Sequence, residues 1–196
     1  MHDVTGVWEP LIHEDAVERL VGRKQGDFSG IPLNEAGRAE AASWNPDAKH
    51  SCLPEGAVYM LRAPARFQIE TGPDNTLTVT SESYRQPRTL KVDGKHPASG
   101  RHSPMGDSVA WWSSDSLVVE TTNMSASLLQ RNGAPYSEDA KMTEFFSRLS
   151  GSHGDLMHVV QVIEDPKYLR QPLIRSVAYR LVPNGKLGTN PCVVGE

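Results

Sequence analysis

The sequence has few cysteines, no strong excess of charge and no long apolar run, and each of these absences excludes a class of protein. The chain of 196 residues carries a net charge of −4 and has no basic cluster that would follow a phosphate backbone. We therefore expect no nucleic-acid partner. No apolar run approaches roughly 18 residues, so we expect no membrane span. The first residues lack the apolar segment of a signal peptide, although a mature exported protein looks the same once its leader has been cut away.

Motifs for cofactors and for common nucleophiles are also missing. The sequence contains no Walker A loop, no G-x-S-x-G turn and no strand-linked G-x-G-x-x-G, so we expect no organic cofactor. The two cysteines, Cys52 and Cys192, form no C-x-x-C pair and cannot make a zinc site alone, and we assign no metal site. Both lie in proline-bounded loops, which favours a disulfide between them over two unrelated buried thiols. Such a bond would close a long loop and stabilise the fold by roughly 4 to 5 kcal/mol.

What is present is typical of an all-β protein. Sixteen glycines and 14 prolines are scattered along the chain, and from Arg66 onward apolar and polar residues alternate in eight or nine short runs separated by turns. Strands joined by hairpins pair antiparallel, and closing the sheet removes its exposed edges. We therefore expect a single domain, residues 1–196, in which an antiparallel meander closes into a lipocalin-like β-barrel. Residues 1–65 are expected to pack on the barrel as an irregular segment with one short helix, capped by Asn34.

Strand alternation places charged side chains on apolar faces. Arg88 shares a face with Leu90, and Glu120 shares one with Val118. Charges are uncommon on buried faces unless they are paired or line a cavity, so these residues predict polar anchors for one small ligand inside the barrel. The alternative is a solvated sheet face; for Glu144 a surface ion pair with Arg148 is favoured. The residues expected to bind the ligand are Arg88, Tyr84, Trp111, Trp112, Phe146, His158 and Tyr179.

The connection DGKHPASGRHSPMGDS, residues 93–108, is the most polar part of the chain. Loops at one end of a barrel converge on its mouth, where binding residues collect. A histidine can accept or donate a proton near pH 7, and a neighbouring carboxylate orients its ring. We therefore predict His96 as a general acid or base, with Asp107 or Glu120 as its partner and Arg88 or Tyr84 as the stabiliser of oxyanion charge. The alternative is a solvated loop stiffened by its prolines.

These residues predict a cofactor-independent enzyme of the lyase, isomerase or dehydratase type that acts on a small cyclic or aromatic molecule. A non-catalytic small-molecule carrier of the periplasm is the first alternative, and a structural envelope protein with a filled core is the second. The sequence leaves the substrate, the reaction class and the oligomeric state open.

Several stretches carry a resemblance to a known family: DGKHP, GDSVAWWSSDSLVVETTN, EFFSRL, VIEDPKYLRQP and YRLV. Over about residues 50 to 195 the chain resembles a family of exported bacterial β-rich proteins without an assigned reaction. The resemblance implies a periplasmic or secreted protein with Cys52 and Cys192 in the matching places. The chain departs from the pattern at Ala110, where glycine is usual, and at Ser113-Ser114, where Glu-Gly is usual.

A shorter stretch, Gly6-Val7-Trp8, resembles the first strand of lipocalin-like barrels. In those proteins an arginine from the last strand lies across the indole. The resemblance therefore implies that Arg180 lies across Trp8.

Overall fold

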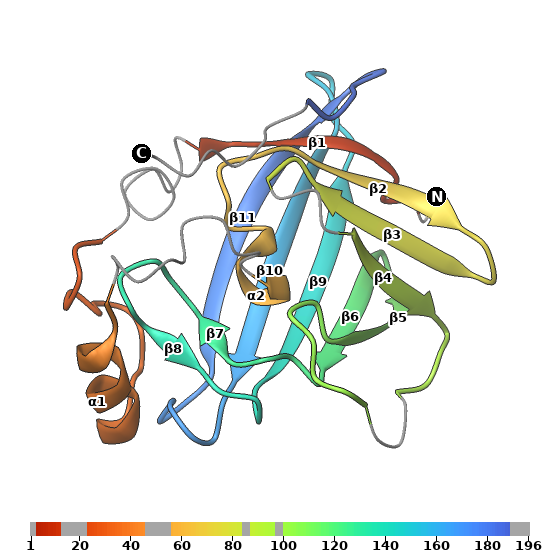
Figure 1. Ribbon diagram of the computed structural model, residues 1–196. Helices are drawn as coiled ribbons and strands as arrows, with labels where there is room; N and C mark the ends of the chain where they lie inside the picture. Colours follow the sequence, from red (N-terminus) through yellow and green to blue (C-terminus); the bar gives the residue numbers. More distant parts are fainter. Residues whose placement is uncertain (1–2, 13–22, 46–55, 84–86, 97–99, 189–196) are drawn as a thin grey trace.

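Nine strands form a closed β-barrel, as Figure 1 shows. The computed structural model describes residues 3–12, 23–45, 56–83, 87–96 and 100–188. Around the barrel the strands are β1 (Gly6–Pro10), β11 (Leu173–Val182), β10 (Leu156–Glu164), β9 (Lys141–Leu149), β6 (Ser116–Thr122), β5 (Asp107–Ser113), β4 (Pro87–Val92), β3 (Thr76–Ser81) and β2 (Phe67–Gly72). The prediction of an all-β barrel is confirmed, with β1 closing the ring between β11 and β2.

One pair of neighbouring strands departs from the expected antiparallel meander. β4 and β5 run parallel, with Leu90 opposite Ser108 and Val92 opposite Ala110. Parallel neighbours need a connection that returns along the length of the strand, and the polar stretch after β4 is that connection. We call its described residues, 93–96 and 100–106, the crossover. The crossover packs closely against Thr122 at Gly106, where an added Cβ would lie 2.4 Å from the Thr122 carbonyl oxygen. Gly106 also has φ +60°, a conformation that favours glycine.

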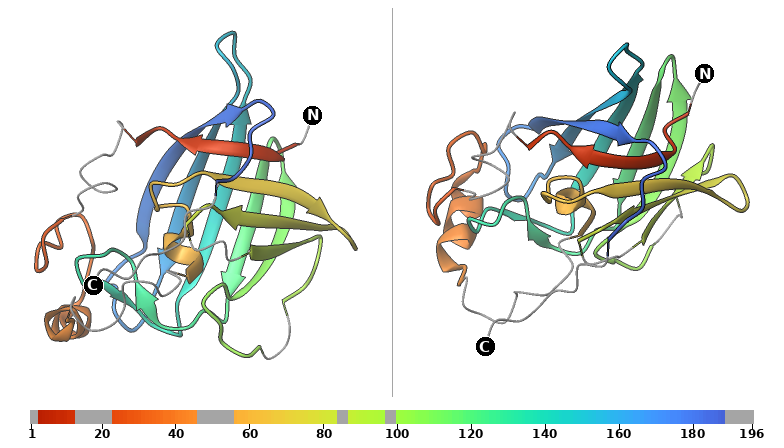
Figure 2. Two further views of the ribbon diagram at one scale, coloured as in Figure 1. Left: turned by 45° about the horizontal axis from the view of Figure 1, so that its top comes forward. Right: turned by 90° about the horizontal axis from the view of Figure 1, so that it is seen from above.

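The chain between β6 and β9 leaves the barrel and carries a small two-stranded sheet. Its strands are β7 (Ser127–Leu128) and β8 (Pro135–Tyr136), while β6 pairs directly with β9. The crossover lies beside this excursion, because Ser103 bridges to Met124. The excursion therefore adds a layer of structure at one end of the barrel, seen from two further sides in Figure 2.

The described residues include two short helices beside the barrel, where the sequence predicts one. The predicted helix is α1 (Glu35–Ser43), and the Asn34 side chain accepts a hydrogen bond from the Gly37 amide at 2.8 Å, which caps it as expected. The second helix, α2 (Gly56–Met60), is entirely buried. Among the described residues no helix has both the length and the apolar character needed to cross a membrane.

The inward side chains form two apolar clusters. The first fills the barrel with aromatic residues, among them Trp8, Phe67, Phe146 and Tyr179, and the rings of Phe67 and Tyr179 meet edge to face with centroids 4.7 Å apart. The second lies between the barrel end, α2 and the β7–β8 sheet. Met105 of the crossover packs against both clusters. The two clusters thus meet where α2 and the crossover cover the barrel.

Candidate functional site

A chain of polar side chains crosses the barrel interior. Arg88 of β4 pairs with Glu144 of β9, with Nη2 2.6 Å from Oε2. Gln161 of β10 donates from Nε2 to Glu144 Oε1 at 2.9 Å. Arg175 of β11 then donates from Nε to Gln161 Oε1 at 2.8 Å. We call these four residues the polar layer, because they link four strands across the inside of the barrel.

The Arg88 guanidinium and the Glu144 carboxylate are both deeply enclosed charges of the layer. Arg88 is 1% exposed and its partner Glu144 is 0% exposed. Arg88 donates from Nε to Ser108 Oγ at 3.0 Å and from Nη2 to Thr121 Oγ1 at 2.6 Å. Its Nη1 is buried and has no hydrogen-bond partner among the described residues. A buried charged donor without a partner is costly, so this atom marks a place where an acceptor would be stabilised.

Helix α2 lies directly over the polar layer. Arg175 donates from Nη2 to the Val58 carbonyl at 2.6 Å and from Nη1 to the Leu129 carbonyl at 2.9 Å. Burial, followed by repulsion from Arg62, lowers the pKa of Arg175 to about 9, which leaves it protonated at neutral pH. The layer therefore carries two guanidinium groups and one carboxylate.

The described methionines lie in or against the apolar clusters, and Met142 also contacts the polar layer. The sequence has six, and all except Met1 lie in or against the two apolar clusters. Gln161 Nε2 lies 3.6 Å from the Met142 sulfur. Because methionine is unbranched and adapts its shape easily, these clusters are deformable where methionines pack, compared with clusters of branched aliphatic residues. These residues are Met60, Met105, Met124, Met142 and Met157.

The predicted catalytic pair lies on the outside of the barrel. His96 Nε2 is 3.0 Å from Glu120 Oε1, as the sequence predicts, and His96 Nδ1 is 3.2 Å from Thr122 Oγ1. Lys141 also pairs with Glu120. Burial raises the pKa of Glu120, but the hydrogen bond and charge of Lys141 and the charge of His96 outweigh it, and the pKa is lowered overall. Glu120 is therefore held as a carboxylate.

The contacts of His96 favour a structural role, holding the crossover to β6, over a role as general acid or base. Nδ1 contacts Thr122 Oγ1, while Nε2 is buried beside Glu120 Oε1 and makes no hydrogen bond to any described residue. A general base needs one nitrogen within reach of the substrate. Asp107, the other predicted partner, is instead held by Asn123, whose Nδ2 donates to its Oδ2 at 2.8 Å. The arrangement ties the crossover to β6 and leaves no ring nitrogen directed into the barrel.

The structure separates the predicted ligand-binding residues into two groups. Arg88, Phe146 and Tyr179 are buried inside the barrel, and Trp112 packs against the first cluster. The expected inward orientation is wrong for Glu120, Trp111 and His158. Each stands on its strand next to residues that face inward, and side chains alternate along a strand. Tyr84, Cys52 and Cys192 lie outside the described residues.

Sequence reasoning missed half of the polar layer. Gln161 lies on the same face of β10 as Met157, Val159 and Ile163, which are all buried. Its spacing from these apolar residues therefore predicts an inward side chain. Arg175 likewise shares a face of β11 with Leu173 and Val177, which are buried. The predicted surface pair of Glu144 with Arg148 is wrong, because Glu144 turns inward to Arg88.

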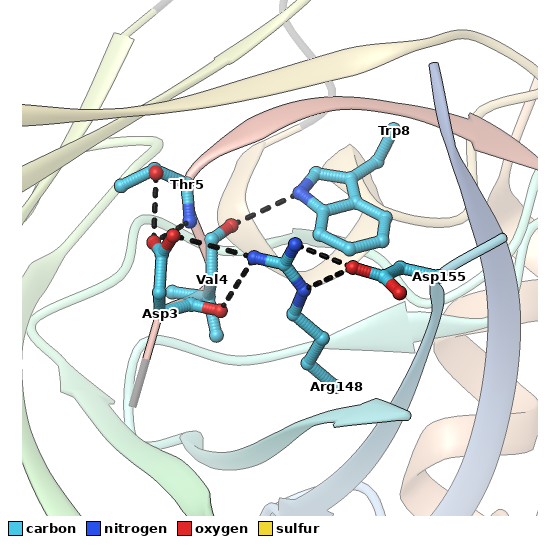
Figure 3. A network of polar contacts seen from close by, with 6 residues as sticks. All are labelled: Asp3, Val4, Thr5, Trp8, Arg148 and Asp155. Carbon is cyan, nitrogen blue, oxygen red and sulfur yellow. Dashed lines mark hydrogen bonds and ion pairs between the residues drawn. The ribbon is translucent and has the colours of Figure 1, made fainter. Parts of the chain in front are cut away.

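Arg148 instead joins a network with Asp3, Trp8 and Asp155, as Figure 3 shows. Its Nε donates to Asp155 Oδ2 at 2.9 Å, and its Nη1 donates to the Asp3 carbonyl at 3.1 Å. The guanidinium lies 5.7 Å from the centroid of the Trp8 ring, whose Nε1 donates to the Val4 carbonyl at 3.0 Å.

The arginine across the first-strand tryptophan is thus Arg148, and the expectation for Arg180 is wrong. Arg180 lies between Tyr179 and Leu181, which pack on the core, so its own side chain points outward. Its Nη2 lies 2.9 Å from Glu9 Oε2 at the surface.

Comparison of the chain with protein-family models, with curated proteins and with solved structures finds no match. The resemblance to the exported β-rich family therefore stays a prediction.

Proposed function

We propose that the protein is a non-catalytic small-molecule-binding barrel, exported to the periplasm or beyond, whose ligand contacts the polar layer and the apolar clusters beside it. The observation that carries this proposal is the buried Nη1 of Arg88, which has no hydrogen-bond partner in the part of the chain that the structure describes. A purely structural core gains little from such a group, because replacing a buried ion pair by apolar residues of similar volume is often neutral or stabilising. The polar layer therefore favours binding over a filled structural core.

A neutral fluorescent dye tests for binding at this place without relying on charge. We expect Nile red to bind the parent protein and to brighten as it enters an apolar environment. Met105→Trp, which enlarges a side chain between the two clusters, is expected to weaken dye binding at least several-fold.

The matched control replaces an exposed aromatic residue on the outer wall. Trp111 is 37% exposed, so Trp111→Ser removes an apolar surface where a dye might also adhere. If Trp111→Ser abolishes the signal and Met105→Trp leaves it unchanged, the proposed site is refuted.

An enzyme remains the second candidate, and the His96–Glu120 contact at 3.0 Å favours it. A screen of small cyclic and aromatic compounds for elimination, addition and isomerisation distinguishes the two functions. Under our proposal the parent shows no turnover, and His96→Ala keeps its affinity for Nile red while losing about 1 kcal/mol of stability with its contacts to β6. Turnover by the parent that disappears in His96→Ala would instead establish the catalytic function.

A further inference from the structure

All of the large apolar side chains that are exposed among the described residues lie on one side of the barrel. They stand on β5, β6's neighbour β9, β10 and β11, within five strands that are consecutive in the sheet (Figure 1), and they point outward. Single exposed apolar residues are common on protein surfaces, but a group gathered on one face marks an interaction site. We call this group the apolar wall, and its members are between 36% and 66% exposed: Trp111, Phe145, Leu149, Leu156 and Ile174.

Strand pairing makes the middle of the apolar wall continuous. Trp111 lies opposite Val118, and Val118 lies opposite Phe145. Phe145 in turn lies opposite Val160. Side chains that are opposite each other on one face of a sheet are in contact range. Val118 points outward and is nevertheless only 4% exposed, since Trp111 and Phe145 flank it. An outward row without a polar side chain therefore crosses four strands.

The charges beside the apolar wall are paired within the chain. Glu120 pairs with Lys141 at one margin, and Arg180 pairs with Glu9 at the other. Between these margins, the row that contains Phe145 holds no charged residue on any of the five strands. A two-fold interface brings the same residues of two copies face to face, so like charges there would repel. This wall can meet an identical wall without such repulsion, and it has no charge excess that would select an oppositely charged partner.

The closed barrel limits how a partner can attach. Each strand of the described ring pairs on both sides, so the ring has no edge to which a further strand could be added. A partner must therefore pack on outward side chains, as the two sheets of a β-sandwich do.

The size of the apolar wall suits a second copy. Strands lie about 4.8 Å apart and side chains on one face repeat about every 7 Å, so five strands and the rows from Ile174 to Leu149 span roughly 650 Å². One partner of a standard interface buries about 800 Å². A second wall of the same size is therefore sufficient to cover the first.

We propose that the apolar wall is the interface of a symmetric homodimer in which two copies of this chain pack wall to wall. The inference goes beyond the proposed ligand binding and does not depend on it. Phe145 stands on β9, the middle one of the five strands, so two-fold symmetry brings the Phe145 side chains of the two copies close together.

Sedimentation velocity of the full-length protein over a series of concentrations tests the inference. The parent is expected to form a dimer with a Kd on the order of 10 µM. Phe145→Lys places two ammonium groups at the centre of the interface and is expected to raise the Kd about 100-fold or more. Because the wall is apolar, raising the NaCl concentration from about 50 to 500 mM is expected to change the parent Kd less than about threefold.

The matched control adds the same charge on the opposite side of the ring. Thr78 of β3 stands between the buried residues Leu77 and Val79, so its side chain points outward. Thr78→Lys is therefore expected to dimerise as the parent does. Far-UV circular dichroism confirms that both lysine variants are folded.

Two results would overturn the proposed dimer. One is a Phe145→Lys variant that dimerises as tightly as the parent. The other is a parent that stays monomeric up to about 500 µM, far above the Kd that an interface of this size implies. If that monomer loses unfolding free energy in Phe145→Lys but not in Thr78→Lys, another segment of the same chain covers the apolar wall in place of a second copy.

Discussion

Glu144→Gln is expected to destabilise the protein more than any other substitution described in this article, by about 3 to 5 kcal/mol. The amide keeps the shape of the side chain but removes the negative charge opposite Arg88, which stays 1% exposed and cannot easily reach water. An uncompensated charge in a low-dielectric interior is far more costly than a lost surface ion pair. Urea denaturation of parent and variant, followed by Trp fluorescence, measures the difference in unfolding free energy.

Two further variants identify the cause. Arg88→Met/Glu144→Leu removes both charges and is expected to recover most of the loss, aided by the hydrogen bond between Ser108 and Thr121 at 3.0 Å. Glu9→Gln makes the same chemical change at the surface, where Glu9 pairs with Arg66 and Arg180, and is expected to cost less than about 1 kcal/mol. If Glu144→Gln and Glu9→Gln lower the unfolding free energy equally, the burial of the Arg88–Glu144 pair does not increase the cost of removing one charge.

Arg148→Met is expected to have the second largest effect, at the opposite end of the barrel. The change removes a hydrogen bond to the Asp3 carbonyl and the guanidinium stacked near the Trp8 indole, together worth about 1 to 2 kcal/mol. Because Arg148 joins the N-terminal segment to Asp155, amide hydrogen exchange near Val4 is expected to accelerate as well. Arg180→Met, an exposed control at the same end, is expected to leave both quantities almost unchanged.

The stabilisation by Arg148 also depends on pH. The hydrogen bond from Arg148 lowers the pKa of Asp155. Burial raises the pKa of Asp3, but contacts from Thr5 and Arg148 outweigh it, and that pKa is also lowered. For carboxyl groups with depressed pKa values, stability is present above the unfolded value of 3.8 and is lost as the pH falls through the folded values. The gap between parent and Arg148→Met should therefore narrow below about pH 4, and a constant gap would contradict the assignment.

The barrel was predictable because its signals are local. Alternation of residues along the strands and turn residues between them identify most of the barrel strands without any knowledge of distant contacts. The parallel pairing of β4 with β5 was not predictable in this way, since it depends on the path of the crossover across the sheet. The excursion between β6 and β9 likewise separates strands that pair in space.

The site was only partly predictable, because the alternation of side chains shows which residues share a strand face but not which face points into the barrel. Glu120 was one of the two partners predicted for His96, and the two side chains are in contact, yet Glu120 lies on the outer face of β6. Arg88 was correctly placed on an apolar face, and its position on the inner side agrees with Leu90, which is buried. Gln161 was not predicted as a partner, because an uncharged side chain interrupts an otherwise apolar strand face less clearly than a charged one does.

The most direct measurement for the polar layer as a ligand site is a crystal structure with neutral 4-bromobenzamide, whose position the anomalous signal of bromine reports. We expect the amide oxygen within hydrogen-bond distance of Arg88 Nη1 and the bromine among the apolar side chains near Met105 and Met142. Bromine bound only to the outer wall near Trp111, with the interior unchanged, would contradict it.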